Sequence, residues 1–304
     1  MGTDIEIQIF QRKTLKDYFF WQKVQRDMDT AFEIFEKMEQ KFSRFREDSE
    51  LSQINIQRWG KMSPEFQEVY TYMQEFYTET EGYFNPLVNV SSIGYDKSFE
   101  KIYKKQEKQQ NIPQDINTDF SSIKTQGDTI ELQIGQNLDF GGIVKGYSVD
   151  KVKNFLREKW YKNFLINAGG DIWIEGKDIS GKHMTIGIDH PVKQEDIFAM
   201  VELSWASLST SWSYKRKWKV WEKQYHHILN PIWEIQDTSI LSVSLIAEDC
   251  MTADVYATSC IAMGYEKSKK FLESHNIAGC IVDADAAMYQ SPSMKNYNIT
   301  LLPV

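Results

Sequence analysis

The stretch that most constrains this chain runs from Asp139 to Asp150 and reads DFGGIVKGYSVD, directly after an apolar run that ends at Leu138. Glycines let main-chain N–H groups approach an anion, and a helix N-terminus adds partial positive charge. Lys145 adds a full positive charge. The stretch therefore predicts a phosphate-binding loop that opens a helix near Gly146. A strand-to-helix turn whose glycines only ease packing is the alternative, because neither GxGxxG nor GxxxxGK[ST] is complete.

The composition is that of an ordinary globular protein, and it excludes several functional classes. The chain has 304 residues, of which 41% are hydrophobic, and carries a net charge of −8. That charge argues against a nucleic-acid partner, and the basic cluster at 215–219 is interpreted as a solvated face. No apolar run approaches the ~20 residues of a membrane span. As given, the chain is expected to be cytoplasmic, although an export segment removed from its start would leave no trace.

The three cysteines form no CxxC pair and lie in the last fifth of the chain, at Cys250, Cys260 and Cys280. Cysteines spaced in this way are typical of small core residues, so neither a disulfide framework nor a zinc site is expected.

Helical and strand patterns intermingle without the regular alternation of a parallel sheet. Strands are expected at 5–10, on both sides of the Gly127–Asp128 turn, and at 164–175, 184–188, 199–205, 239–247 and 278–282. Helices are expected over 24–42, from Pro64 after an N-cap at Ser63, from near Gly146 to Trp160, and from near Thr252. The segment FSRFREDSELSQIN at 42–55 is expected to be turn-like, and 96–118 to be a surface excursion. The fold class is therefore α+β, with a mostly antiparallel sheet packed with helices in one domain over 1–304.

Two residues near the C-terminal end could ligate a metal ion. Asp254 and Thr258 stand four residues apart, which places them on one face of a helix. A carboxylate and a hydroxyl so placed suit a hard cation such as Mg²⁺. In the alternative, Thr252 or Asp254 caps the helix and the Thr258 hydroxyl bonds back to a carbonyl.

Two further segments contain polar groups that could take part in binding or catalysis. In YHHILNP, adjacency places His226 and His227 on opposite sides of an extended chain, so at most one faces a site. In ASLSTSWSYKR, the cluster around Thr210 and Ser211 could bind phosphate, and a turn is the favoured interpretation. The pair Gly169–Gly170 within FLINAGGDIWIEG suggests a strand bulge or a close approach by a ligand or backbone.

Taken in order, these pieces resemble the FAD:protein FMN transferase family of the ApbE type. The matching pieces are MGT at 1–3, FSRFREDSELSQIN at 42–55, GYFNPLV at 82–88, DFGGIVKGYSVD at 139–150, INAGGDI at 166–172, ASLSTS at 206–211, HHILNP at 226–231 and TADVYAT at 252–258. The resemblance implies a T-fold-like architecture that binds FAD with Mg²⁺. It also implies transfer of the FMN half of FAD to a Thr or Ser hydroxyl of an acceptor protein, with release of AMP.

The resemblance assigns roles to residues at matching positions. Asp254, with Thr258 and the Gly142 carbonyl, is expected at the metal and counts as catalytic. His227 resembles a general base. The remaining positions are implied to contact FAD, either along the flavin nucleotide or near its pyrophosphate: Met1, Phe45, Asp139, Lys145, Asn167, Gly169, Gly170, Thr210 and Ile228.

The chain also departs from the family pattern. Trp212 stands where the family commonly has the glycine of TSG, and Asn230–Pro231 stands where DPxTG is common. These changes affect the expected acceptor contacts and adenine pocket more than the metal and phosphate ligands. Two alternatives keep the same residues: a Mg²⁺-dependent FAD pyrophosphatase that gives FMN and AMP, and a non-catalytic FAD-binding protein.

Overall fold

The computed structural model describes residues 3–11, 17–87, 116–193, 196–213, 217–220, 223–226, 228–231 and 238–302. Three expectations fall wholly or mostly outside these ranges. They are the flavin contact at Met1, the base at His227, and the surface excursion at 96–118, of which only the last three residues are described.

The centre of the fold is a seven-stranded sheet in the order β1-β5-β6-β9-β12-β13-β14. Its strands are β1 (Ile5–Ile9), β5 (Phe164–Ala168), β6 (Asp171–Glu175), β9 (Ala206–Trp212), β12 (Ile240–Ala247), β13 (Ala278–Asp283) and β14 (Met288–Gln290). All the strand pairings in the described part of the chain are antiparallel. The predicted fold class, α+β with a mostly antiparallel sheet, is confirmed.

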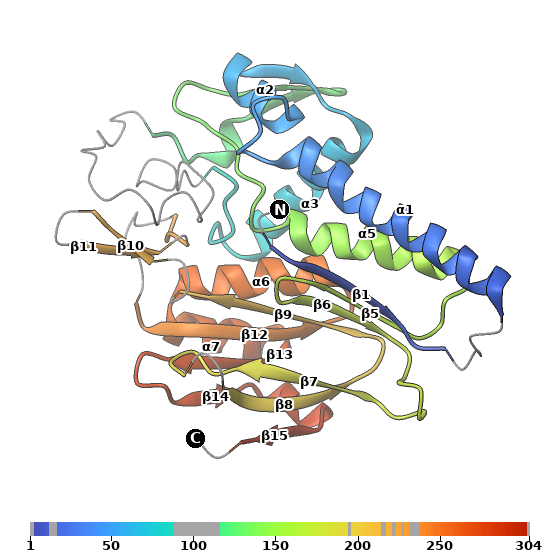
Figure 1. The fold of residues 1–304 in the computed structure, drawn as a ribbon. Coiled ribbons are helices and arrows are strands. Elements are labelled where there is room, and N and C mark those ends of the chain that lie inside the picture. The colour runs from blue at the N-terminus through green and yellow to red at the C-terminus, as the bar shows by residue number, and fades with distance from the viewer. Residues whose placement is uncertain are drawn as a thin grey trace.

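Helices cover one face of this sheet and a smaller sheet covers the other. The helices are α1 (Tyr18–Phe42), α5 (Val144–Glu158), α6 (Cys250–Met263) and α7 (Tyr265–Ser274). The small sheet contains β7 (Met184–Asp189), β8 (Ile197–Leu203) and β15 (Ile299–Leu301). Successive side chains of a strand point to opposite faces of the sheet, so each face has its own core. On β6, Trp173 packs with α1 and α5, while the next residue, Ile174, packs with β7 and β8. Figure 1 shows α1 and α5 side by side above β1 and β5.

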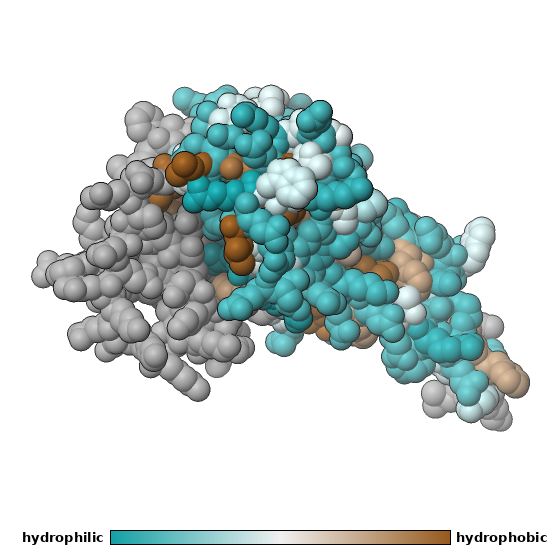
Figure 2. All heavy atoms as spheres, turned by 90° about the horizontal axis from the view of Figure 1, so that it is seen from above, coloured by the Kyte–Doolittle hydropathy of each residue, from teal (hydrophilic) through white to brown (hydrophobic). Residues whose placement is uncertain are grey.

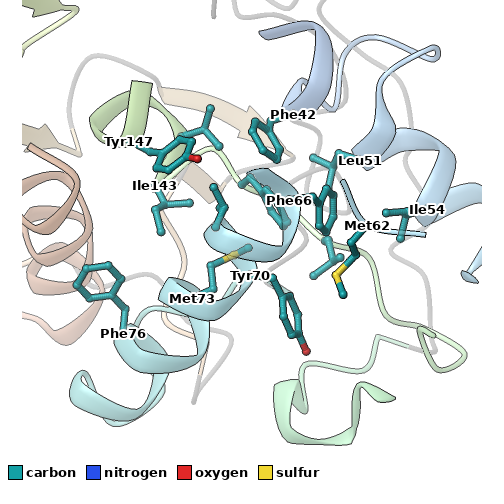
Figure 3. Close-up of a cluster of buried hydrophobic side chains, with 14 of the residues drawn as sticks. Phe42, Leu51, Ile54, Met62, Phe66, Tyr70, Met73, Phe76, Ile143 and Tyr147 are labelled. Carbon is teal, nitrogen blue, oxygen red and sulfur yellow. The ribbon is translucent and has the colours of Figure 1, made fainter. Parts of the chain in front are cut away.

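A second group of elements packs beyond the N-terminal end of α5. It contains α2 (Glu50–Gln57), α3 (Pro64–Glu79), β2 (Trp59–Lys61), β3 (Lys124–Gln126) and β4 (Thr129–Glu131). Its core includes Phe42, Phe66 and Met73, and it extends to Ile143 and Tyr147 at the start of α5 (Figure 3). This core therefore anchors the loop that was expected to bind phosphate. The other described elements are the β10 (Lys217–Val220) and β11 (Lys223–His226) hairpin and the 3-10 turns at Phe120–Ser122 and Pro292–Asn296.

The helix patterns and the cysteines were predicted well. One face of α1 is buried, at Val24, Ala31, Phe35, Met38 and Phe42. Ser63 caps α3 by accepting a hydrogen bond from the Phe66 amide. All three cysteines are buried and unpaired. These features succeeded because each depends on local periodicity or capping chemistry.

Four local expectations were wrong. The segment expected to be turn-like contains most of α2, because Ser49 caps a short helix with Leu51 and Ile54 buried. The strand bulge expected at Gly169–Gly170 is instead the two-residue turn of the β5–β6 hairpin, with both φ angles positive (66° and 100°), while the close approach of a ligand stays a prediction. The turn favoured for the Ser/Thr cluster at 206–212 is instead strand β9, and the hydroxyls of Ser207, Thr210 and Ser211 find partners on neighbouring elements. Trp160 lies beyond the end of α5 and is exposed.

Seen from above, the described part of the surface is mostly hydrophilic, with a few separate hydrophobic side chains (Figure 2). Within the described ranges, no helix combines the length and the apolar character needed to span a bilayer.

Candidate active site

Asp139 organises the loop that precedes α5. Its amide donates to the Pro86 carbonyl at 2.7 Å, and its Oδ1 accepts from the Gly141 amide at 2.8 Å. Its Oδ2 lies 3.3 Å from Arg44 Nη1. The conformation of the loop is therefore set by Asp139 itself, with Arg44 as an ion-pair partner at the end of α1.

Lys145 is the centre of a buried charged cluster on the second residue of α5. Its ammonium forms an ion pair with Asp171 at the start of β6 and lies 3.1 Å from both carboxylate oxygens of Asp254 on α6. Asp171 and Asp254 are both almost fully buried. The cluster joins three elements that are distant in sequence.

Burial and the neighbouring charges both shift the pKa values of Asp254 and Lys145. Burial raises the pKa of Asp254, the neighbouring Asp171 carboxylate raises it further, and the Lys145 ammonium opposes both effects. Burial alone lowers the pKa of Lys145, but the two carboxylates outweigh it and raise that pKa above its ordinary value. Lys145 therefore stays protonated at neutral pH.

Oxygen donors of the kind that Mg²⁺ prefers lie beside this cluster. Thr258 follows Asp254 by one helical turn, and its hydroxyl lies 3.1 Å from the Ser211 hydroxyl on β9. Gly142 faces the same threonine, since a Cβ built on Gly142 would lie 3.5 Å from Thr258 Cγ2. A carboxylate and a hydroxyl one helical turn apart, with the main chain of Gly142 close to that hydroxyl, are oxygen groups of the kind that suits a hard cation.

The residue that caps the N-terminus of α6 is neither Thr252 nor Asp254. Asp249 is the N-cap of α6 and accepts hydrogen bonds from both the amide and the hydroxyl of Thr252. Capping by Thr252 or Asp254 is therefore wrong for α6. Asp254 instead accepts a hydrogen bond from the Gly146 amide of α5, at 3.2 Å.

The Gly169–Gly170 turn lies where β5, β6 and β9 meet. Asn167 Oδ1 accepts from the Gly170 amide at 3.0 Å, and the Gly170 carbonyl accepts from the Thr210 amide at 3.2 Å. A Cβ at Gly169 would collide with the Thr3 side chain, and one at Gly170 would lie 3.3 Å from the Trp212 ring. Both positions thus require glycine for φ and for space.

The remaining predicted FAD contacts are distributed around this region. The Thr210 hydroxyl lies 2.9 Å from that of Ser244, inside the sheet. Phe45 is 46% exposed, and the Arg44 guanidinium lies 4.6 Å from its ring centroid, so it adjoins the Asp139 loop. Ile228 is buried in the core formed by β12, α6 and α7. Met1 and His227 cannot be placed, since they lie outside the described residues.

Asp171 and Arg44 were not identified from the sequence. The only signal for Asp171 is that it directly follows the glycine pair of INAGGDI, and Arg44 has none beyond its place in FSRFRED. In the described part of the chain, no three His, Cys, Asp or Glu side chains form a metal cage. A metal here would need hydroxyl, carbonyl or substrate oxygens in addition to Asp254.

Comparison with known proteins identifies the family. The model of the ApbE family matches residues 1–281. The chain belongs to the ApbE family. Among curated ApbE-type relatives, the FAD:protein FMN transferase of Vibrio cholerae is 26% identical over 98% of this chain and 90% of its own length. That of Haemophilus influenzae is 27% identical over 81% of this chain and 75% of its own.

Solved ApbE structures have the same fold. The flavin transferase ApbE of Vibrio cholerae covers 98% of this chain and 96% of its own, with a TM-score of 0.80 at 24% identity. The ApbE protein of Thermotoga maritima covers 97% and 96%, with a TM-score of 0.82 at 24% identity. These likenesses confirm the predicted architecture.

Proposed function

We propose that this chain transfers the FMN moiety of FAD to a Thr or Ser hydroxyl of an acceptor protein, with Mg²⁺ as cofactor and AMP as the leaving product. The observation that carries the proposal is the position of Lys145 between two buried carboxylates, beside the Thr258 hydroxyl and Gly142. Membership of the ApbE family and the names of its curated relatives support the same activity.

The charge of the cluster favours a divalent cation. When Lys145 is protonated and both carboxyl groups are ionised, the three side chains sum to −1. A cation beside Asp254 would favour that ionised form and oppose the burial that raises the pKa of Asp254. A bound Mg²⁺ turns that sum to +1, which suits a pyrophosphate ligand. Asp254, Thr258 and the Gly142 carbonyl would hold the ion, with substrate phosphate oxygens and water completing its shell. The ion would supply charge neutralisation at the phosphoryl oxygens.

The reaction is an in-line phosphoryl transfer. The acceptor hydroxyl oxygen forms a bond to the phosphorus of the FMN half, while the bond from that phosphorus to the bridging oxygen breaks and AMP leaves. The hydroxyl proton passes to a base, for which His227 is our candidate. Lys145, held by Asp171, offsets charge on the phosphate groups. The Asp139 loop and the Gly169–Gly170 turn, with Asn167, shape the main chain around the ligand.

Intact-mass measurement tests this proposal directly. The protein is incubated with FAD, Mg²⁺ and an acceptor carrying a single target threonine, and the matched control is the same acceptor with that threonine replaced by alanine. The expected result is a gain of one FMN residue on the threonine acceptor only, with one AMP released per transfer. Free FMN with an unmodified acceptor would indicate a pyrophosphatase, and tight FAD binding without AMP release would indicate a binding protein.

A further inference from the structure

Two exposed tryptophans lie outside the candidate active site in an unusual backbone conformation. Trp160 is 81% exposed and has φ = 68°, while Trp205 is 55% exposed and has φ = 53°. Both φ values fall in the left-handed region, which is uncommon for bulky residues and is ordinarily filled by glycine.

Trp160 occupies the position of a helix-terminating glycine. The Trp160 amide donates to the Arg157 carbonyl at 2.9 Å, and the Tyr161 amide donates to the Leu156 carbonyl at 3.1 Å. These two bonds define a Schellman motif at the end of α5, and its left-handed residue is most often glycine. Because its side chain is exposed, tryptophan at this position does little for the packing of the core.

Trp205 occupies a left-handed position in a short link between strands of two different sheets. The link between β8 and β9 is only Ser204–Trp205, since β8 ends at Leu203 and β9 begins at Ala206. A left-handed residue at the end of such a tight link is again a position that glycine adopts without strain. Two independent turns thus hold a strained, exposed tryptophan.

Both tryptophans line one open pocket of about 500 Å³. The pocket lies at the C-terminal end of α5, whereas Lys145 lies at its N-terminal end. Thirteen residues of helix separate Lys145 from Glu158 at the end of α5, which corresponds to roughly 20 Å at the helical rise per residue. The pocket is therefore separate from the Lys145 cluster, and α5 runs between them above the sheet (Figure 1).

The charged groups of the pocket favour an anionic ligand. Arg157 and Lys162 both line it, together with the carboxylate of Glu175. Glu175 and Arg157 form an ion pair, since Glu175 Oε2 lies 2.8 Å from Arg157 Nη2 and 3.0 Å from Arg157 Nε, and the same oxygen accepts from Trp173 Nε1 at 3.0 Å. The charges of this pair offset each other, so Lys162 supplies the net charge of the lining. The lining thus carries a net charge of +1, on a chain whose net charge is −8.

We propose that this pocket binds an acidic peptide segment of a partner protein. In this arrangement an apolar side chain of the segment packs between Trp160 and Trp205, and an adjacent Asp or Glu pairs with Lys162, beside the Arg157–Glu175 ion pair. Tryptophan and arginine are the residues that most often dominate protein–protein binding energy, and the cationic pocket complements a carboxylate. Residues held in strained conformations at a surface concentrate at binding sites. The proposal is independent of the flavin-transfer activity.

The test uses a phage-displayed library of random 12-residue peptides selected on the full-length protein, followed by anisotropy titration of the enriched synthetic peptides. Trp160→Gly and Trp205→Gly are the diagnostic variants, because glycine suits both backbone conformations. Trp59→Ala is the matched control, since Trp59 is also 55% exposed but lies on β2 in another sheet. Lys162→Glu tests the charge requirement at an exposed position.

We expect enriched peptides with Asp or Glu beside an apolar residue. Each glycine variant should raise their Kd at least tenfold and Lys162→Glu at least fivefold, while Trp59→Ala leaves Kd unchanged. The melting temperatures of the glycine variants should equal or exceed that of the wild type. Three binding results overturn the proposal: no enrichment of peptides, peptides with the same Kd for the wild type and the glycine variants, or tryptophan-dependent binding of an oligosaccharide or of AMP in place of the peptides. A lower melting temperature of both glycine variants also overturns it, since the tryptophans would then be packing residues.

Discussion

Asp150 and Asp254 each accept hydrogen bonds from the N-terminal turn of the helix on which the other lies. Asp150 of α5 accepts from the Cys250 and Met251 amides of α6, at 3.1 and 2.8 Å. Asp254 of α6 accepts from the Gly146 amide of α5, at 3.2 Å. Each carboxylate satisfies otherwise unpaired donors and lies at a positive helix end. The exchange fixes the two helices against each other and places Asp254 beside Lys145.

Replacing Asp254 with asparagine should nearly abolish flavin transfer. The side chain keeps its shape, but the negative charge that faces Lys145 and the proposed metal is lost. We expect the initial rate of FMN transfer to fall by about 10²-fold or more, the usual effect of removing an electrostatic catalytic group. The measurement is the rate of acceptor modification by intact mass at saturating FAD and Mg²⁺.

Asp150→Asn is the matched control for that variant, since it weakens the reciprocal helix cap and leaves the Lys145 cluster intact. It should lower the free energy of unfolding by about 1–3 kcal/mol, as expected for a buried carboxylate that accepts two amides. The rate per folded molecule should stay within a few-fold of the wild type. Equal losses of rate in the two variants would show that Asp254 acts only through packing.

Replacing Gly146 with alanine should separate α5 from α6. A Cβ at this position would lie 2.6 Å from the Cys250 carbonyl oxygen and 2.6 Å from Met251 Cα, both backbone atoms that cannot move aside. We expect a loss of about 3 kcal/mol in unfolding free energy by urea denaturation, together with reduced transfer. Gly127→Ala is the control, because nothing lies within 4 Å of its added Cβ and only its φ of 59° is unfavourable. That variant should cost about 1 kcal/mol and keep full activity.

Removing Mg²⁺ should stop transfer without unfolding the protein. Treatment with EDTA should reduce FMN transfer to background, and excess Mg²⁺ should restore it, because the proposed ligands neutralise phosphate charge only with the ion present. The melting temperature should change little, because Asp254 is already paired with Lys145 and the Gly146 amide. Transfer that continues at the same rate in EDTA would contradict the role of the metal.

Asp27 should make stability depend on acid pH. Burial by itself raises the pKa of Asp27, but hydrogen bonds from Lys23 at 2.7 Å and the Tyr161 hydroxyl at 2.8 Å outweigh it, so this pKa is below its ordinary value of 3.8. A lowered folded-state pKa stabilises the protein above the unfolded pKa, and the stabilisation is lost as pH falls through the folded pKa. At pH 7 the free energy of unfolding of the wild type should exceed that of Asp27→Asn by about 1 kcal/mol. The difference should shrink below about pH 4, measured by urea denaturation at each pH. A difference independent of pH would exclude this linkage.

The features that the sequence predicted correctly share one property, which is that neighbouring residues decide them. Helical and strand periodicity predicts the apolar face of α1, the strands around Gly127–Asp128 and the helix face shared by Asp254 and Thr258. Local capping chemistry predicts the Ser63 cap. Trp160 was misplaced for a related reason, because periodicity alone does not show where a Schellman turn ends a helix.

Two of the predictions that failed depend on partners distant in the sequence. The Ser/Thr cluster resembles a turn signal until β9 pairs with β6 and β12, since a central strand accepts hydroxyls whose partners lie on adjacent elements. The glycine pair resembles an irregularity within one strand until β5 and β6 pair as a hairpin around it.

The sequence by itself determined the chemical inventory: a glycine-rich loop with Lys145, a helix with Asp254 and Thr258, and the order of pieces that marks the ApbE family. Only the tertiary structure decided that Lys145 joins Asp171, 26 residues away, to Asp254, 109 residues away. The physical reason is that buried charges must be paired, and the pairing is made by helices and strands whose contacts no local pattern contains. The glycine-rich loop thereby became one side of a shared charged cluster, with Gly146 allowing the close helix contact that completes it.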